Sequence, residues 1–292
     1  MKPQRLAILL MIGEAVLFAA ETAVIHQIGT RVPVMTVALL RAAGGLALAA
    51  IMARHVGTAV IRTRQRPLQL LRGGVSLLYL WVMVYSFSRL PFADATAISY
   101  TQTAYIAAFS VLLLGEAVTP TRWTAAAIGI AGALLIARPA FAGWRPAYLI
   151  ALGGAALNGF AFVLSRYLQR EDSAQTTMFY ANLVMVVGNL PTLVMSSLPA
   201  PETWPWVPAL LVLGPLGMYL GIVAVRHAPA SALAPYPLLR LVIGMTGGIA
   251  VFGERPDLAA LSGATLILGS CALSVIQGRP LTVASSSETR HQ

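Results

Sequence analysis

The chain of 292 residues is apolar and basic: 58% of its residues are hydrophobic, only 10% are charged, and the formal net charge is +10. Because soluble proteins carry about a quarter charged residues, this composition, with a mean hydropathy of +0.76, excludes an ordinary soluble domain and indicates a membrane protein. The basic residues mostly flank apolar segments and no basic stretch is interleaved with aromatics, so no nucleic-acid partner is expected. The single Cys271 excludes an internal disulfide, and four scattered His residues predict neither a metal site nor a cofactor.

Apolar runs of about 20 residues, the length that crosses a bilayer, divide the chain from end to end. They predict an all-α polytopic membrane protein with ten transmembrane helices near 7–27, 33–53, 69–88, 94–114, 121–138, 146–168, 174–195, 204–225, 231–252 and 257–276. The first run follows Lys2 and Arg5 and could be read as a signal peptide. Glu14 and Glu21 interrupt it, however, so we expect an uncleaved first span.

The fragment from Leu90-Pro91 to Gly115-Glu116 recurs as Ala228-Pro229 to Gly253-Glu254, 138 residues further along the chain. In both copies a proline opens an apolar run and Gly-Glu closes it. The repeat predicts two copies of one five-helix unit. Internal repeats of this kind are typical of membrane transporters, in which the substrate site lies between the halves.

The repeat also sets the expected domains and their orientation. We expect repeats at residues 1–140 and 141–278, followed by a polar, disordered cytoplasmic tail at 279–292. Because each unit has an odd number of helices, the second enters the membrane from the opposite side, which makes the repeats inverted.

The placement of Lys and Arg predicts that both termini are cytoplasmic. With the N-terminus inside, the cytoplasmic side carries Lys2, Arg5, Arg54, Arg62, Arg64, Arg66, Arg72, Arg122, Arg166, Arg170, Arg226, Arg279 and Arg290. The outer side carries only Arg31, Arg89, Arg138, Arg145 and Arg255. This asymmetry predicts a multi-pass protein of the bacterial cytoplasmic (inner) membrane.

The segment from Leu71-Arg72-Gly73-Gly74 to Ile98, together with Gly115-Glu116, resembles the drug/metabolite transporter superfamily of the EamA type. The second copy, from Arg226 to Gly253-Glu254, fits the same pattern less closely, so the resemblance covers nearly the whole chain. It implies ten helices in two inverted halves and a central cavity that moves small metabolites across the cytoplasmic membrane. The family includes amino-acid exporters, among them a YddG-like aromatic amino-acid group, and carriers that take up S-adenosylmethionine.

The chain departs from the family in its fourth and ninth helices. Many members have a proline in the fourth helix where Thr103 stands here. The matching position in the ninth helix is Leu241, with Pro235 and Pro237 placed earlier. Helix kinks and cavity shape are therefore expected to differ from those of the relatives.

Four charged residues lie inside predicted spans. Glu14 and Glu21 share one face of the first helix, and each would cost roughly 2.5–3.5 kcal/mol at mid-bilayer, so each should face a cavity or a partner. Arg41 and Arg240 lie at depths that match, which allows the intramembrane pairs Glu21–Arg41 and Glu14–Arg240. Two interpretations stay open: the pairs fix helix packing, or one member binds substrate or titrates, with protons as the coupling ion.

Aromatic and amide side chains complete the predicted substrate site. Tyr236 and Arg240 are four residues apart, on one face of the predicted ninth helix, whereas their counterparts in the first copy are Ile98 and Gln102. A site that reads one asymmetric molecule needs such a difference between the halves. The expected substrate-binding residues are Glu14, Tyr79, Tyr100, Asn158, Tyr236 and Arg240. In this prediction the tyrosines form the wall, Arg240 reads a carboxylate, and Glu14 or Asn158 reads an ammonium.

These patterns favour a secondary transporter, most simply an exporter of amino acids with aromatic or large apolar side chains. Uptake of a metabolite such as S-adenosylmethionine and a channel or membrane scaffold without transport are the alternatives. No enzyme is expected, because the deep acids share one helix and no nucleophile motif or phosphate loop is present. The expected partners are a small-molecule substrate and the lipid bilayer, and a monomer suffices because both halves lie in one chain.

Overall fold

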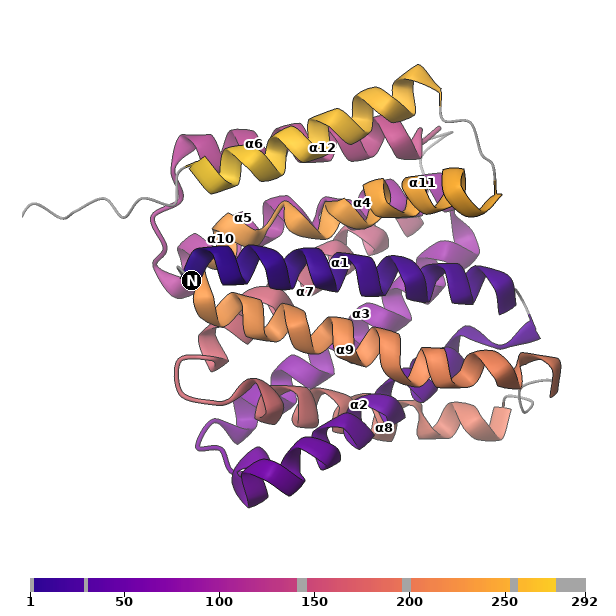
Figure 1. Cartoon of the computed structure of the whole chain (residues 1–292), viewed down its shortest axis with the longest axis vertical. Helices are drawn as coiled ribbons and strands as arrows, with labels where there is room; N and C mark the ends of the chain where they lie inside the picture. Colours follow the sequence, from indigo (N-terminus) through magenta and orange to yellow (C-terminus); the bar gives the residue numbers. More distant parts are fainter. Residues whose placement is uncertain (1–2, 29–30, 141–145, 196–200, 253–256, 277–292) are drawn as a thin grey trace, which may run out of the picture.

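The computed structural model describes residues 3–28, 31–140, 146–195, 201–252 and 257–276, and within these ranges it contains helices, turns and loops but no strand (Figure 1). The helices of the first half are α1 (Pro3–Ile28), α2 (Val34–Val56), α3 (Arg66–Arg89), α4 (Phe92–Tyr100), α5 (Gln102–Leu114) and α6 (Pro120–Ala137). Those of the second half are α7 (Pro146–Leu168), α8 (Ala174–Met195), α9 (Val207–His227), α10 (Ala230–Leu233), α11 (Leu239–Phe252) and α12 (Leu258–Ile276). Short 3-10 turns are η2 (Gly57–Val60), η3 (Pro201–Trp206) and η4 (Tyr236–Leu238). The tail predicted at 279–292 lies outside the described residues.

The described helices confirm the membrane prediction at a coarse level. Seven helical segments of the described chain are long and apolar enough to cross a membrane, and a shorter apolar helix covers Leu258–Ser274. The chain is thus an all-helical, polytopic membrane protein.

The fourth predicted span, 94–114, is divided into two helices. α4 ends at Tyr100, and Thr101 (φ −63°, ψ −13°) separates it from α5. The Thr101 hydroxyl donates to the carbonyl oxygen of Ile98 at 2.6 Å, and the Thr101 N–H reaches the same oxygen at 3.0 Å. These i-to-i−3 bonds tighten the helix locally without a proline.

The ninth predicted span, 231–252, is divided at the corresponding level. Pro235 and Pro237 lack the N–H that a continuous α-helix needs, and the chain forms the turn η4 before α11 begins at Leu239. η4 ends at Leu238 and α4 ends at Tyr100, which are 138 residues apart like the rest of the repeat. Both halves therefore break at one level by different chemical means.

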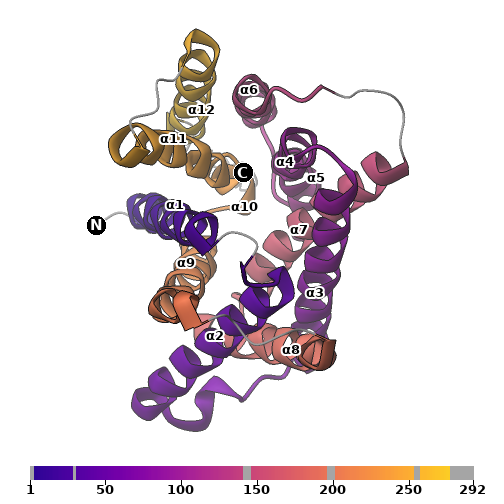
Figure 2. The same cartoon turned by 90° about the vertical axis from the view of Figure 1, so that its right-hand side faces the viewer.

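Helices of one half pack mainly on helices of the other, and the contacts occur in matched pairs. α1 packs on α9 as α7 packs on α3, and α1 packs on α11 as α7 packs on α5. α2 contacts α8, and α6 contacts α12, each the counterpart of the other. Figure 2, which views the helices nearly end-on, shows the resulting ring. This exchange of partners is the pattern of a pseudo-two-fold axis between the halves.

The last helices of the two halves run in opposite directions. Ser270 of α12 donates to the Ala125 carbonyl near the start of α6 at 2.6 Å, whereas Asp257, just before α12, pairs with Arg138 at the end of α6. α12 thus ends on the side of the molecule where α1 begins (Figure 1). A Cβ on Gly132 would lie 2.6 Å from the Gly263 carbonyl oxygen, so small residues let these two backbones touch.

Candidate functional site

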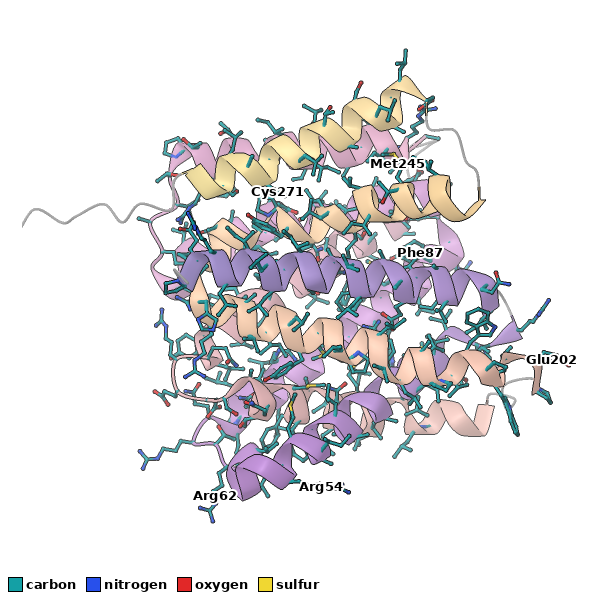
Figure 3. The ribbon with its side chains drawn as sticks, in the orientation of Figure 1. Arg54, Arg62, Phe87, Glu202, Met245 and Cys271 are labelled. Carbon is teal, nitrogen blue, oxygen red and sulfur yellow. The ribbon has the colours of Figure 1, made fainter. Side chains whose placement is uncertain are left out.

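A cavity of about 1470 Å³ lies between the halves and is lined by side chains from both. At one end its wall includes Ile25, Phe87 and Ile249, from the last turns of α1, α3 and α11. Figure 3 shows Phe87 and Met245, another lining residue, in the part of the molecule away from the N-terminal end of α1. The cavity therefore extends toward the end of the bundle opposite that start.

Polar contacts between the halves close the other end. Oε1 of Glu116 accepts the Ala230 N–H at 3.1 Å, and Oε2 accepts the Ser231 N–H at 3.2 Å and its hydroxyl at 2.7 Å. Arg166 donates to the carbonyl oxygen of Val225 at 2.6 Å. The glutamate that closes the first repeat unit thus caps a turn of the second half and holds the two halves together there.

The two charge pairs that depth allowed are both present, on one wall. Glu21 Oε1 lies 2.9 Å from Arg41 Nε, and Glu14 Oε1 accepts a hydrogen bond from Arg240. Phe18, between the two glutamates on α1, lies 5.2 Å from the Arg41 guanidinium and 4.0 Å from that of Arg240. At these separations the ring attracts both cations.

These carboxylates are almost completely buried, with 5% of Glu14 and 2% of Glu21 exposed. Glycines of α9 make room for them: a Cβ on Gly214 would lie 2.3 Å from Glu21 Oε1. Glu14 Oε2 is buried and has no hydrogen-bond partner in the described chain. Since this residue lines the cavity, the wall offers an unused acceptor to a donor in the cavity.

Tyr79, Tyr100 and Asn158 also line the cavity, as expected for a substrate site. The Asn158 amide donates to Gln102 Oε1, a bond between α7 and α5. The two tyrosine rings stand on α3 and α4, so both belong to the first half. The structure thus brings five of the six predicted substrate-binding residues to one cavity.

Tyr236 lies elsewhere, which corrects the prediction for this residue. It is 2% exposed, belongs to the apolar core with Leu238 and Cys271, and is not part of the cavity wall. The prediction assumed one α-helix through Tyr236 and Arg240. The η4 turn, with about three residues per turn, rotates the two side chains apart.

The two-fold relation shows that the charged wall belongs to one half only. Gly221 faces Glu14, and Met83, 138 residues earlier, faces Gly154 in the same way. Gly154 is therefore the counterpart of Glu14, and Gln102 is the counterpart of Arg240 at the 138-residue offset. A glycine and an amide thus replace the ion pair in the other half, and the cavity is asymmetric.

Sequence reasoning missed Arg72 as a cavity residue. It was assigned to the cytoplasmic segment before the third span, but α3 already begins at Arg66 and buries Arg72 to 7% exposure. Its Nε donates to Ser165 Oγ at 2.8 Å. The available signal was the helical spacing of Arg72, Ser76, Tyr79 and Met83, all of which line the cavity.

Comparison with known proteins gives a consistent result. The model of the EamA-like transporter family matches residues 5–138 and 145–276. A pseudopaline exporter of Pseudomonas aeruginosa is 25% identical over 268 residues, which cover 90% of this chain and 94% of the relative. A riboflavin transporter of Brucella anthropi is 28% identical over 274 residues (89% and 95%), and an S-adenosylmethionine uptake transporter of Rickettsia prowazekii is 23% identical over 239 residues (81% and 80%).

A solved crystal structure shares the fold, with a TM-score of 0.82 at 20% sequence identity over 94% of this chain and 98% of that chain.

Proposed function

The chain belongs to the EamA-like transporter family, and we propose that it is a secondary transporter that exports amino acids with aromatic or large apolar side chains. One observation carries this proposal: the cavity wall combines charged groups of both signs with two tyrosine rings. Charged groups of both signs suit a zwitterion, and tyrosine rings offer flat apolar surfaces to its side chain. The proposed binding residues are Glu14, Tyr79, Tyr100, Asn158 and Arg240.

The chain is a multi-pass protein of the bacterial inner membrane, and we propose ten spans in two inverted repeats, residues 1–140 and 141–278, with both termini cytoplasmic. The antiparallel α6 and α12 support the inversion. Arg54 and Arg62 lie at the end of the molecule where α1 begins, and Glu202 lies at the opposite end (Figure 3). The positive-inside rule then puts the start of α1 in the cytoplasm. A monomer is proposed as the working unit.

Cysteine labelling tests this topology. In a Cys271→Ala background, Arg62→Cys should be protected from an impermeant maleimide in intact cells and react after lysis, whereas Glu202→Cys should react in both. The two positions are exposed ends of the described structure, so reactivity reports their side of the membrane. Labelling of Arg62→Cys in intact cells would contradict the orientation and the span count together.

Counterflow in proteoliposomes tests the function. Purified protein loaded with unlabelled phenylalanine should accumulate labelled phenylalanine saturably, above protein-free liposomes, because a carrier exchanges one bound substrate for another. Leucine and tryptophan should compete, whereas glycine should not, since it lacks an apolar side chain to place against Tyr79 and Tyr100. A signal that rises linearly with concentration would indicate a channel instead.

Protons are the proposed coupling ion, because Glu14 and Glu21 are the carboxylates of the described cavity wall. The same liposomes separate the two modes: coupled transport responds to an imposed pH gradient, whereas facilitated exchange does not.

Uptake of S-adenosylmethionine is the second candidate function. It is supported by the uptake transporters of that name in Rickettsia, which match up to 86% of this chain. S-adenosylmethionine also carries both a carboxylate and cationic groups, for which the same wall has partners. Counterflow of labelled S-adenosylmethionine that phenylalanine does not inhibit would favour this function over amino-acid export.

A further inference from the structure

Arg72 differs from the other arginines of the cavity wall. The described lining contains Arg41, Arg72 and Arg240, and two of these are paired with Glu21 and Glu14. For Arg72 the described residues provide no carboxylate within ion-pair distance. The described cavity wall thus holds one positive charge more than it holds negative charges.

The charge on Arg72 is deeply buried and incompletely bonded. Only 7% of the residue is exposed, and while Nε donates to Ser165 Oγ at 2.8 Å, Nη1 has no hydrogen-bond partner. A guanidinium cannot shed its proton to escape burial. A buried cation without a counterion is costly, so a ligand that supplies an acceptor here would gain both a hydrogen bond and charge neutralisation.

Packing between α3 and α7 does not account for an arginine at this position. The two-fold counterparts of Arg72 and Ser165 are Leu210, at the 138-residue offset, and Ile25, at the offset that relates Glu14 to Gly154. These two belong to a single apolar cluster between α9 and α1. Apolar side chains therefore hold the equivalent helix pair in the other half, and the polar pair serves another purpose.

We propose that Arg72 binds the carboxylate of the transported molecule at the closed end of the cavity, with Ser165 fixing the guanidinium through Nε. This inference deepens the proposed transport function and rests on it. Ser76 and Tyr79 follow Arg72 along the same cavity-lining stripe of α3. At 1.5 Å per residue Tyr79 stands about 10 Å further along the axis, which leaves room for the body of a small metabolite between the cation and the ring.

The proposal also assigns the remaining cations. Arg240 is bound to Glu14 and stacked on Phe18, and Arg41 is bound to Glu21, so neither guanidinium is free for a carboxylate. Carboxylate recognition therefore moves from Arg240, where the sequence pattern put it, to Arg72. A substrate group with a single negative charge matches the excess charge of the wall.

The test compares matched ligands on purified full-length protein. Phenylalanine, its amide and 3-phenylpropionate share the ring but differ in the carboxylate and the ammonium, and their dissociation constants are measured by calorimetry or thermal shift. Wild-type protein should prefer phenylalanine to phenylalaninamide. In Arg72→Gln, phenylalanine should bind roughly ten- to a hundredfold more weakly, as expected when a charge-assisted hydrogen bond is lost, while the amide binds as before. Arg72→Lys, which keeps the charge, should fall between them.

Arg122→Gln is the control, because Arg122 also donates to a serine, Ser231 at 2.8 Å, but does not line the cavity. It should bind like wild type. Retention of the acid-over-amide preference in Arg72→Gln would overturn the Arg72 site and leave the amino-acid function standing. Should Arg72→Gln not fold, an unchanged acid-over-amide preference in Arg72→Lys overturns the proposal in the same way.

The wild-type pattern separates the remaining outcomes. Binding of 3-phenylpropionate but not of phenylalanine would overturn amino-acid export and support the carboxylate site. Wild-type protein that binds none of these carboxylates, or that is stabilised by inorganic phosphate alone, would overturn the proposal for Arg72.

Discussion

Replacing Arg41 with alanine should leave a protein that misfolds or melts well below wild type. Glu21 is 2% exposed, and its Oε1 lies 2.9 Å from Arg41 Nε, so the substitution leaves a buried carboxylate without its cation. Removing one partner of a buried pair costs about 3–5 kcal/mol, a large share of the stability of any fold. Fluorescence-detected size exclusion and a thermal melt of detergent-solubilised protein measure the loss.

Arg54→Ala is the matched control, since Arg54 is on the same helix but exposed. It should elute and melt like wild type. An Arg41→Ala protein with wild-type stability would show that the pair contributes little to the fold.

The double variant Glu21→Gln with Arg41→Gln decides what the pair is for. Removing both charges leaves no uncompensated ion, so folding should recover. Folding that recovers without counterflow makes the pair functional. Recovery of both would assign the pair to helix packing, the interpretation that sequence alone leaves open.

The fold and the charged wall were predictable because each depends on patterns that a sequence carries directly. Apolar runs report spans, and the recurrence of Pro91 and Glu116 as Pro229 and Glu254 reports the repeat. Depth along predicted helices was enough to match Glu21 with Arg41 and Glu14 with Arg240. Buried charges have few possible partners in a membrane, and this scarcity makes pairing inferable.

Other parts of the site could not be predicted because they depend on local backbone geometry. The apolar run 231–252 reads as one helix, and nothing in its hydropathy shows that Pro235 and Pro237 turn Tyr236 into the core. In the first half the break at Thr101 comes from a hydroxyl that bonds to a carbonyl, which a threonine in a helix need not do. Substrate contacts lie near these breaks, so their residues are the least predictable.

Arg72 was overlooked for a different reason. A basic residue at the start of an apolar run is normally an interfacial anchor, and the positive-inside rule counts it as one. The helix that begins at Arg66 instead carries it more than a turn into the protein. Helix starts are uncertain by a few residues in any sequence-based assignment, and here that shift separates a surface charge from a buried one.

The asymmetry of the cavity connects these residues to transport. Symmetric packing would be satisfied by similar residues at paired positions, as it is where Gly132 meets Gly263. The cavity instead has Glu14 against Gly154, Arg240 against Gln102 and Arg72 against Leu210. The differences between the halves are concentrated at residues of the wall, which is where a molecule with two unlike ends would need them.

Arg240→Gln should abolish amino-acid counterflow while the protein stays folded and monodisperse. Glutamine fits at this level, because the counterpart Gln102 already occupies it in the other half and bonds to Asn158. Its amide can still donate to Glu14, so the carboxylate keeps a partner. What the variant loses is the charge that holds Glu14 and the contact with Phe18, 4.0 Å from the guanidinium.

The ligand dependence separates this effect from that of Arg72. If Arg240 orients Glu14, whose Oε2 has no partner, for a substrate ammonium, Arg240→Gln should weaken binding of phenylalanine and phenylalaninamide alike. If Arg240 itself read the carboxylate, only phenylalanine would bind more weakly. Glu14→Gln with Arg240→Gln is the control, because it removes both charges and should fold but not transport. Normal counterflow by Arg240→Gln would assign Arg240 to the scaffold and remove it from the site.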